Sequence, residues 1–146
     1  MTLVVVFLAF KVAYNIGDLR QLLWPRTAAV GLLADVLTVA GLVVAVWARA
    51  VLGRNWSGRV VLKQDHDLVQ RGPYACVRHP IYSGLLLMGL GTAVESGRLT
   101  GFVILAAVAI LFAVKAQFEE RLMIRHFPEA YPDYRRRVKA LIPGVW

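Results

Sequence analysis

The sequence predicts an all-α integral membrane protein with about four transmembrane helices and a C-terminal amphipathic helix at the membrane interface. Of its 146 residues, 58% are hydrophobic and the mean hydropathy is +0.59, whereas soluble domains are about 45–50% apolar. Residues 28–51 and 99–118 each supply the roughly 20 mostly apolar residues that a spanning helix needs. The second stretch reaches that length by including Lys115, whose ammonium can extend to the headgroups. Two shorter apolar stretches, residues 3–16 and 81–94, complete the predicted set.

The connections between these stretches differ in character. The first stretch follows Met1 without a basic leader or a small-residue cleavage site, so we expect no cleaved signal peptide. Trp24 and Pro25 mark an interface before the second stretch. The long polar connection that follows, residues 53–80, is expected to be functional or partly structured. Glu95-Ser-Gly-Arg98 predicts a tight turn, so the third and fourth stretches should be antiparallel neighbours.

The C-terminal segment changes to an amphipathic pattern. From Phe127 to Leu141, apolar side chains recur three, four and seven residues apart, while the basic side chains point elsewhere. This pattern predicts a helix on the membrane surface, ended by Pro143 and Gly144.

The distribution of charge predicts the orientation in the membrane. The net charge is +8, and basic residues gather in residues 54–78 and 121–139. The positive-inside rule places both segments and both termini in the cytoplasm, with the protein in the cytoplasmic membrane. Attraction to anionic headgroups explains the basic residues better than a nucleic-acid partner, which is not expected.

A single domain, residues 1–146, is the economical interpretation, because no repeat, low-complexity stretch or flexible linker interrupts the chain. It would comprise two membrane helices (1–52), a cytoplasmic loop (53–80), a helical hairpin (81–118) and a cytoplasmic interfacial tail (119–146).

A dense polar and aromatic cluster, residues 71–84, directly precedes the third apolar stretch. Pro80 suits the first turn of a helix, and His79 before it is biased towards an extended backbone. The free N–H groups of Ile81, Tyr82 and Ser83 would then form a positive helix end that suits a carboxylate or a phosphate. The alternative is that His79-Pro80 merely starts a helix at the interface.

Glu119 and Glu120 form a second polar cluster at the end of the fourth stretch. Two adjacent carboxylates near the headgroups are costly unless they are hydrated or paired. On a helix they diverge by about 100°, so one can face a pocket while the other pairs with an arginine. A helical hairpin would return them to the same membrane face as His79 and create one pocket. The alternative is an ordinary solvated helix end.

Other candidate residues give weaker signals. Gly89 and Gly91 inside the third stretch most often allow close helix packing, since a lone Gly-x-Gly lacks the rest of a dinucleotide fingerprint. The three histidines lack metal-ligand spacing, and no metal is expected. Cys76 cannot form an internal disulfide and has no recognisable base beside it.

Several of these motifs together resemble a known family. Residues 72–84 read Gly-Pro-Tyr-Ala-Cys-Val-Arg-His-Pro-Ile-Tyr-Ser-Gly; His-Asp-Leu-Val (66–69) precedes them, and Glu119-Glu120 and Tyr131-x-x-Tyr134 follow. In this order they resemble the isoprenylcysteine carboxyl methyltransferase family and the related phospholipid N-methyltransferases, over roughly residues 52–143. The resemblance implies a membrane methyltransferase that takes S-adenosylmethionine from the cytosol and a lipophilic or lipid-modified acceptor from among the membrane lipids.

The resemblance also implies roles for particular residues. Glu119 and Lys115 would be catalytic, with Lys115 at a position where the prenylcysteine enzymes carry an arginine that helps to bind substrate. A lysine keeps the charge but loses the bidentate fork, so recognition of the acceptor is expected to differ. The cofactor-binding residues would be His66, Asp67, Leu68, Val69, Tyr74, His79, Pro80, Ile81, Tyr82, Gly89, Gly91, Glu119 and Glu120.

The favoured interpretation is an S-adenosylmethionine-dependent O-methyltransferase acting on a lipophilic carboxylate. A carboxylate is already nucleophilic, so alignment and exclusion of water could supply most of the rate. Three alternatives stay open: a phospholipid or small-amine N-methyltransferase, a sterol-reductase-like protein with a nicotinamide cofactor, and a non-enzymatic membrane scaffold.

Overall fold

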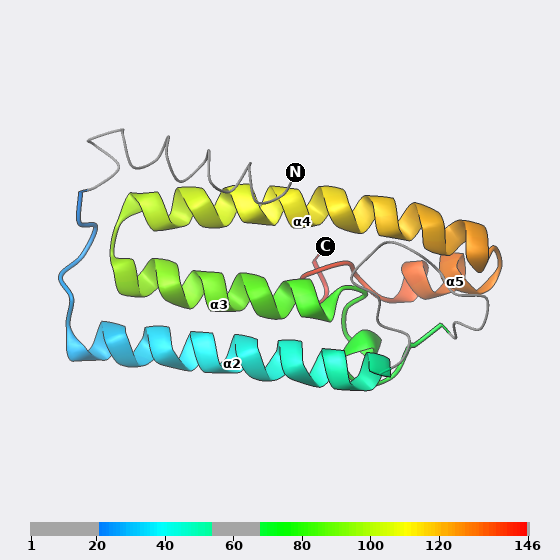
Figure 1. The fold of residues 1–146 in the computed structure, drawn as a ribbon, viewed down its shortest axis with the longest axis horizontal. Coiled ribbons are helices and arrows are strands. Elements are labelled where there is room, and N and C mark those ends of the chain that lie inside the picture. The colour runs from blue at the N-terminus through cyan, green and yellow to red at the C-terminus, as the bar shows by residue number, and fades with distance from the viewer. Residues whose placement is uncertain (1–20, 54–67, 146) are drawn as a thin grey trace. The chain divides into compact units, whose positions relative to one another are not determined.

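The computed structural model describes residues 21–53 and 68–145, and this part of the chain is all-α (Figure 1). The predicted first membrane stretch, residues 3–16, lies outside the described residues. The elements are α2 (Ala28–Leu52), a 3₁₀ helix η3 (Gly72–Ala75), α3 (Pro80–Ser96), α4 (Leu99–His126) and α5 (Ala130–Arg137).

Helices α2 and α4 are long and apolar enough to cross a membrane, with 25 and 28 residues respectively. Helix α3 has 17 residues and begins at Pro80, as the sequence predicted. Helix α4 extends to His126, beyond the predicted end at residue 118, so Glu119 and Glu120 lie within a continuous helix.

The described chain forms two compact units, whose boundaries fall within the three long helices. Unit 1 contains the described part of residues 1–42 together with residues 85–113, and unit 2 contains the described part of residues 43–84 together with residues 114–145. The single-domain organisation stays a prediction.

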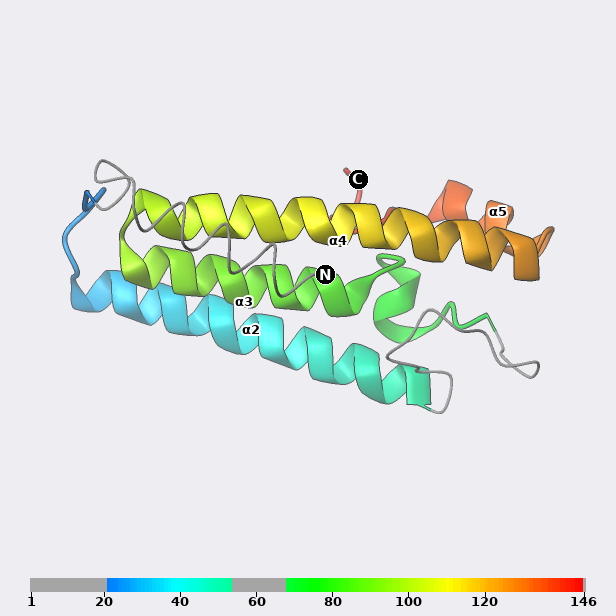
Figure 2. The same ribbon diagram turned by 45° about the horizontal axis from the view of Figure 1, so that its top comes forward.

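In unit 1, segments of α2, α3 and α4 lie side by side, with α3 between the other two (Figure 1 and Figure 2). Small residues permit the close approach: a Cβ on Gly91 would lie 2.6 Å from the Ala34 carbonyl oxygen of α2. The α3–α4 connection is the predicted tight turn, with Gly97 at φ +60°. The Leu23 N–H donates to the Gly97 carbonyl at 2.7 Å, which attaches the segment before α2 to this turn. The two helices are therefore antiparallel neighbours, as predicted.

In unit 2, the segment after α5 folds back onto the residues before α3. The backbone N–H groups of Arg78 and His79 donate to the carbonyls of Lys139 and Ala140 at 2.8 and 3.0 Å. Helix α5 therefore ends at Arg137, whereas the apolar spacing predicted a helix up to residue 141. The prediction was wrong there because pairing with residues 77–79 holds the chain extended.

The apolar side of α5 packs within unit 2. Tyr131 and Tyr134 are each only 3% exposed, and the Tyr134 hydroxyl donates to the Tyr74 carbonyl at 2.6 Å. The amphipathic pattern of the tail thus reflects protein packing at these two positions.

Candidate functional site

The residues before α3 are positioned by turn chemistry and by backbone pairing. Gly72 adopts φ +60°, a conformation that favours glycine, and a Cβ there would lie 3.2 Å from the Val51 side chain. Pro73 and Tyr74 are buried in η3. Pairing of the next residues with the tail then fixes His79 immediately before Pro80, which is fully buried at the start of α3.

Glu119 is the centre of one group of polar contacts. Its Oε1 accepts a 2.6 Å hydrogen bond from the Tyr82 hydroxyl, and its Oε2 lies 3.5 Å from His79 Nδ1. Lys115 Nζ lies 3.9 Å from Oε1 and 5.3 Å from the centre of the Tyr82 ring. The side chain of Glu119 is 26% exposed. This carboxylate is therefore oriented by two side chains of the other cluster and remains partly accessible.

Glu120 is buried and surrounded by donors. Its Oε1 accepts from Arg78 Nε and Nη2 at 2.9 and 2.6 Å, and lies 3.2 Å from His79 Nε2. Its Oε2 lies 3.2 Å from Arg135 Nε. Arg78 also donates to the backbone carbonyls of Arg135 and Val138, so one guanidinium joins α4 to the C-terminal segment.

His79 connects the two glutamates and stacks on an aromatic ring. Its two ring nitrogens face Glu119 and Glu120, and its ring lies parallel to that of Tyr82, with centroids 5.5 Å apart. Burial alone would lower the pKa of His79, but hydrogen bonds to the two carboxylates and their charges outweigh it and raise the pKa above 6.5. The cluster therefore favours the imidazolium.

The tyrosines of unit 2 stay neutral phenols. Burial, with a smaller contribution from the Glu119 charge, raises the pKa of Tyr74 to about 12. Burial likewise raises the pKa of Tyr134. Their hydroxyl groups therefore act as hydrogen-bonding groups and not as bases near neutral pH.

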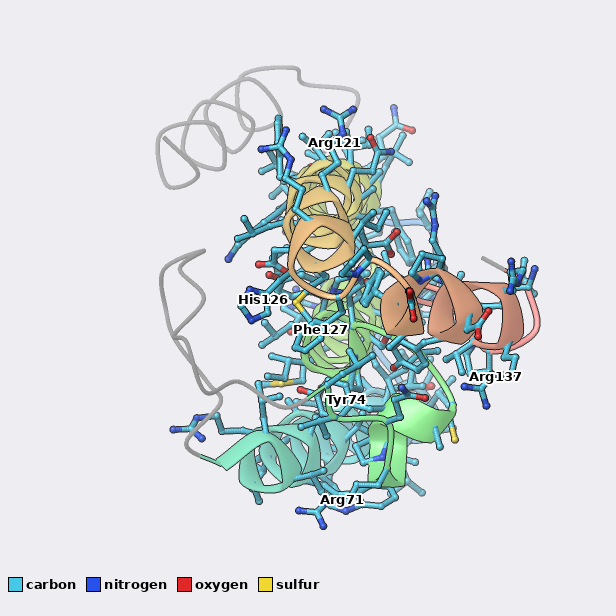
Figure 3. All side chains as sticks on the ribbon, turned by 90° about the vertical axis from the view of Figure 1, so that its right-hand side faces the viewer. Arg71, Tyr74, Arg121, His126, Phe127 and Arg137 are labelled. Carbon is cyan, nitrogen blue, oxygen red and sulfur yellow. The ribbon has the colours of Figure 1, made fainter. Side chains whose placement is uncertain are left out.

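Figure 3 looks onto the end of unit 2. The side chains of Arg71, Arg121 and Arg137 point outward at different sides of the view, and Tyr74 lies inside, among the helices. The outward arginines make this part of the molecule strongly basic. The side chains of His79, Glu119 and Glu120, in contrast, are half-buried or buried.

The structure brings together the two clusters that the sequence singled out. The predicted residues of unit 2 that the structure describes are Leu68, Val69, Tyr74, His79, Pro80, Ile81, Tyr82, Lys115, Glu119 and Glu120. Gly89 and Gly91 belong instead to unit 1, where they pack against α4 and α2. His66 and Asp67 lie outside the described residues.

One expectation about the start of α3 was wrong. The Ser83 N–H donates to the His79 carbonyl at 3.1 Å, and the His79 N–H is used by Ala140. The Ser83 N–H is therefore not a free donor for an anionic ligand, because the first helical turn already uses it.

Sequence reasoning also missed two residues of the network. Arg78 was not singled out, although one of the two glutamates was expected to pair with an arginine, and Arg135 approaches from the tail. Tyr134, which the sequence named in its Tyr-x-x-Tyr motif, donates to the Tyr74 carbonyl. Among the described residues, no group of three or more potential ligands could hold a metal ion.

The arrangement has the chemistry of a site for a charged organic ligand. A partly accessible carboxylate beside an aromatic ring suits an ammonium or a sulfonium group. The neighbouring Lys115 ammonium suits an anionic group, and the charge of the His79 imidazolium adds to the attraction.

Comparison with known proteins shows the family to which the chain is similar. The model of the isoprenylcysteine carboxyl methyltransferase (ICMT) family matches residues 32–125. The chain is 35% identical over 115 residues to the nickel-cobalt-cadmium resistance protein NccN of Alcaligenes xylosoxydans xylosoxydans, covering 77% of this chain and 52% of that protein. It is 33% identical over 96 residues to the protein-S-isoprenylcysteine O-methyltransferase of Schizosaccharomyces pombe, covering 64% and 41% respectively.

Two further matches are a methyltransferase named for a different acceptor and a solved structure. The methanethiol S-methyltransferase 2 of Bradyrhizobium diazoefficiens is 45% identical over 74 residues, covering 50% of this chain and 27% of that protein. The solved structure of the eukaryotic intramembrane Ras methyltransferase ICMT matches with a TM-score of 0.74 and 25% identity, over 97% of this chain and 50% of that one. The chain thus spans about half or less of the length of these relatives. The family model matches most of the length of this chain, and its all-α fold is like that of an intramembrane enzyme. This membrane protein therefore belongs to the isoprenylcysteine carboxyl methyltransferase family.

Proposed function

We propose that this chain is a membrane-embedded S-adenosylmethionine-dependent methyltransferase that methylates a lipophilic carboxylate acceptor, in the manner of the isoprenylcysteine carboxyl O-methyltransferases. The observation that supports it best is the junction of the two clusters: Tyr82 and His79 at the start of α3 both contact Glu119 of α4. This junction lies within the part of the chain that the family model matches.

The residues of the junction fit the groups of the cofactor. The Glu119 carboxylate suits the ammonium of the amino acid end, and the Tyr82 ring suits the sulfonium or the adenine. The His79 imidazolium attracts the cofactor's carboxylate by its charge only, because its two ring nitrogens already face Glu119 and Glu120. The partial exposure of Glu119 leaves this side accessible to a ligand.

The bound cofactor supplies an electrophilic methyl group on its sulfonium. The protein's part is to bind, to orient and to exclude water, since a carboxylate acceptor needs no base. Lys115, with 44% of its side chain exposed, would attract and orient the acceptor carboxylate next to Tyr82. Its single ammonium does this as a point charge, without the fork of an arginine.

Two other methyl acceptors are the competing possibilities. A phospholipid or small-amine acceptor must be a neutral amine, so it would need a base or a desolvated pocket, and the cations Lys115 and His79 disfavour an ammonium ion. A small thiol acceptor is supported by the 45% identity with a methanethiol S-methyltransferase over half of this chain. A thiolate, like a carboxylate, is an anionic nucleophile that these cations would favour.

The test is transfer of a labelled methyl group from S-adenosylmethionine in membranes that contain the protein. A carboxylate acceptor gives a methyl ester that base cleaves to labelled methanol, a phospholipid amine gives an N-methyl group that base does not release, and methanethiol gives a volatile sulfide. The Glu119→Gln variant should lose transfer, whereas Glu129→Gln, which removes an exposed carboxylate outside the cluster, should retain it. Transfer that is indifferent to Glu119→Gln would contradict the assignment of this site.

Binding of a nicotinamide cofactor in place of S-adenosylmethionine would instead favour the reductase-like alternative. A scaffold would show no ligand binding that depends on Glu119 or His79. The proposal also includes four membrane segments and a tail at the membrane interface. It places the unit 2 cluster and both termini on the cytoplasmic side of the cytoplasmic membrane.

A further inference from the structure

The two adjacent glutamates have different surroundings and therefore different roles. The Glu120 side chain is 8% exposed, against 26% for Glu119. Four N–H groups, from Arg78, His79 and Arg135, surround the Glu120 carboxylate, which offers about four acceptor sites. Three of these groups face Oε1 and one, from Arg135, faces Oε2, so a cofactor ammonium could reach this carboxylate only at an oxygen that is itself almost fully buried. Glu120 is therefore poorly placed to bind the cofactor directly.

The contacts of Glu120 lead to Glu119 through a single side chain. His79 Nε2 lies 3.2 Å from Glu120 Oε1, and His79 Nδ1 lies 3.5 Å from Glu119 Oε2. Only the imidazolium has an N–H on both ring nitrogens, so only the charged form can donate to both carboxylates at once. The protonation state of His79 thus couples the buried Glu120 to the accessible Glu119.

We propose that Glu120 is a positioning residue: held by Arg78, it keeps His79 as the imidazolium, whose second N–H orients the Glu119 carboxylate. The proposal rests on the proposed function in one respect only, namely that Glu119 binds the cofactor's ammonium. It assigns Glu120 a role through His79 and not as a cofactor ligand.

The charged groups around His79 are consistent with this role. Glu119 and Glu120 face the ring from α4, and Tyr82 stacks on it from α3. The nearby cations are paired with the same carboxylates, Arg78 and Arg135 with Glu120 and Lys115 with Glu119, which reduces their repulsion of an imidazolium. The two carboxylates raise the pKa of His79 in spite of its burial.

The charge of His79 can be measured directly by NMR of protein with ¹⁵N-labelled histidine in detergent micelles, without cofactor. The His79→Gln variant identifies its signal among the three histidines of the chain. In the wild type, the titration midpoint of His79 should lie above the ordinary value of about 6.5. A midpoint at or below that value would overturn the proposal.

The variant Glu120→Gln keeps the shape of the side chain and removes its charge. Loss of an opposite charge at this distance should lower the His79 midpoint by about one pH unit or more. At a pH above both midpoints, the imidazolium fraction, and with it the affinity for S-adenosylhomocysteine, should fall about tenfold. The alkaline limb of the binding profile should therefore move to lower pH, whereas Glu129→Gln should leave both profiles unchanged.

A merely structural role for Glu120 predicts something else: a loss of affinity that is equal at every pH, or a His79 midpoint that does not move. Either result would overturn the proposal. Failure of the wild type to bind S-adenosylhomocysteine at any pH would overturn the proposed function, while a raised His79 midpoint that falls in Glu120→Gln would still support the coupling of the two residues.

Discussion

Replacing Gly91 with alanine should destabilise the protein because the new methyl group has no room against α2. A Cβ at this position would lie 2.6 Å from the Ala34 carbonyl oxygen and 3.0 Å from the Thr38 backbone nitrogen. Both are backbone atoms of a helix, so relief requires the helix itself to move. Overpacking of this kind typically costs about 1–3 kcal/mol.

The neighbouring Gly89→Ala substitution provides a matched control in the same helix. Its Cβ would lie 3.0 Å from Leu105 Cδ1, which is the end of a flexible side chain and can rotate away. We therefore expect Gly89→Ala to change the free energy of unfolding far less than Gly91→Ala, on the order of a few tenths of a kcal/mol.

Reversible unfolding of both variants in mixed detergent micelles, followed by circular dichroism, measures the difference. The packing interpretation predicts a lower midpoint for Gly91→Ala only. Wild-type stability for Gly91→Ala would refute it, and so would an equal loss in the two variants. If the Gly-x-Gly instead contacts the cofactor, both substitutions should weaken cofactor binding without a change in stability.

Three further predictions concern unit 2. The raised pKa of His79 means that the folded state binds the His79 proton more tightly than the unfolded state does. The resulting stabilisation is present below pH 6.5 and is lost as the pH rises through the folded-state pKa. The melting temperature of His79→Gln should therefore depend less on pH over this range than that of the wild type. Tyr134→Phe leaves the buried Tyr74 carbonyl without its donor and should cost about 1–3 kcal/mol in denaturant unfolding. Cys76 is exposed beside the cluster, so a membrane-impermeant maleimide should label it in inverted vesicles but not in intact cells; labelling of intact cells would contradict the proposed orientation.

The elements that the sequence predicted best are those controlled by local chemistry. Pro80 begins α3 because its missing N–H is tolerated in the first turn. Gly97 ends α3 and forms the turn to α4 because it adopts φ +60°. Each of these signals is contained within a few residues, so no knowledge of the rest of the fold was needed.

The sequence predicted that the two polar clusters meet, but not which arginine pairs with which glutamate. A helical hairpin was expected to bring Glu119 to the cluster that contains His79 and Tyr82, and the structure confirms this contact. Which glutamate would be buried depended on Arg78, 42 residues earlier in the chain, and on Arg135 of the next helix, α5. A sequence shows that a buried carboxylate needs a partner but does not choose among several arginines.

The C-terminal segment shows where periodicity fails. Apolar residues at helical spacing continue to Leu141, yet the helix ends at Arg137 because the next residues pair with residues 77–79. Such tertiary pairing overrides local propensity, and it also explains why Tyr131 and Tyr134 are buried within unit 2. The same contacts hold His79 in place, so the misread segment is part of the site.

The central claim is that the unit 2 cluster binds S-adenosylmethionine through Glu119 and Tyr82. The most direct measurement is calorimetric titration of S-adenosylhomocysteine into detergent-purified wild-type protein and into folded Glu119→Ala, Tyr82→Ala and Glu129→Ala variants. The account predicts saturable binding by the wild type and by Glu129→Ala, with affinity at least tenfold weaker in the other two. A folded wild type that does not bind, or equal binding by all four proteins, would contradict it.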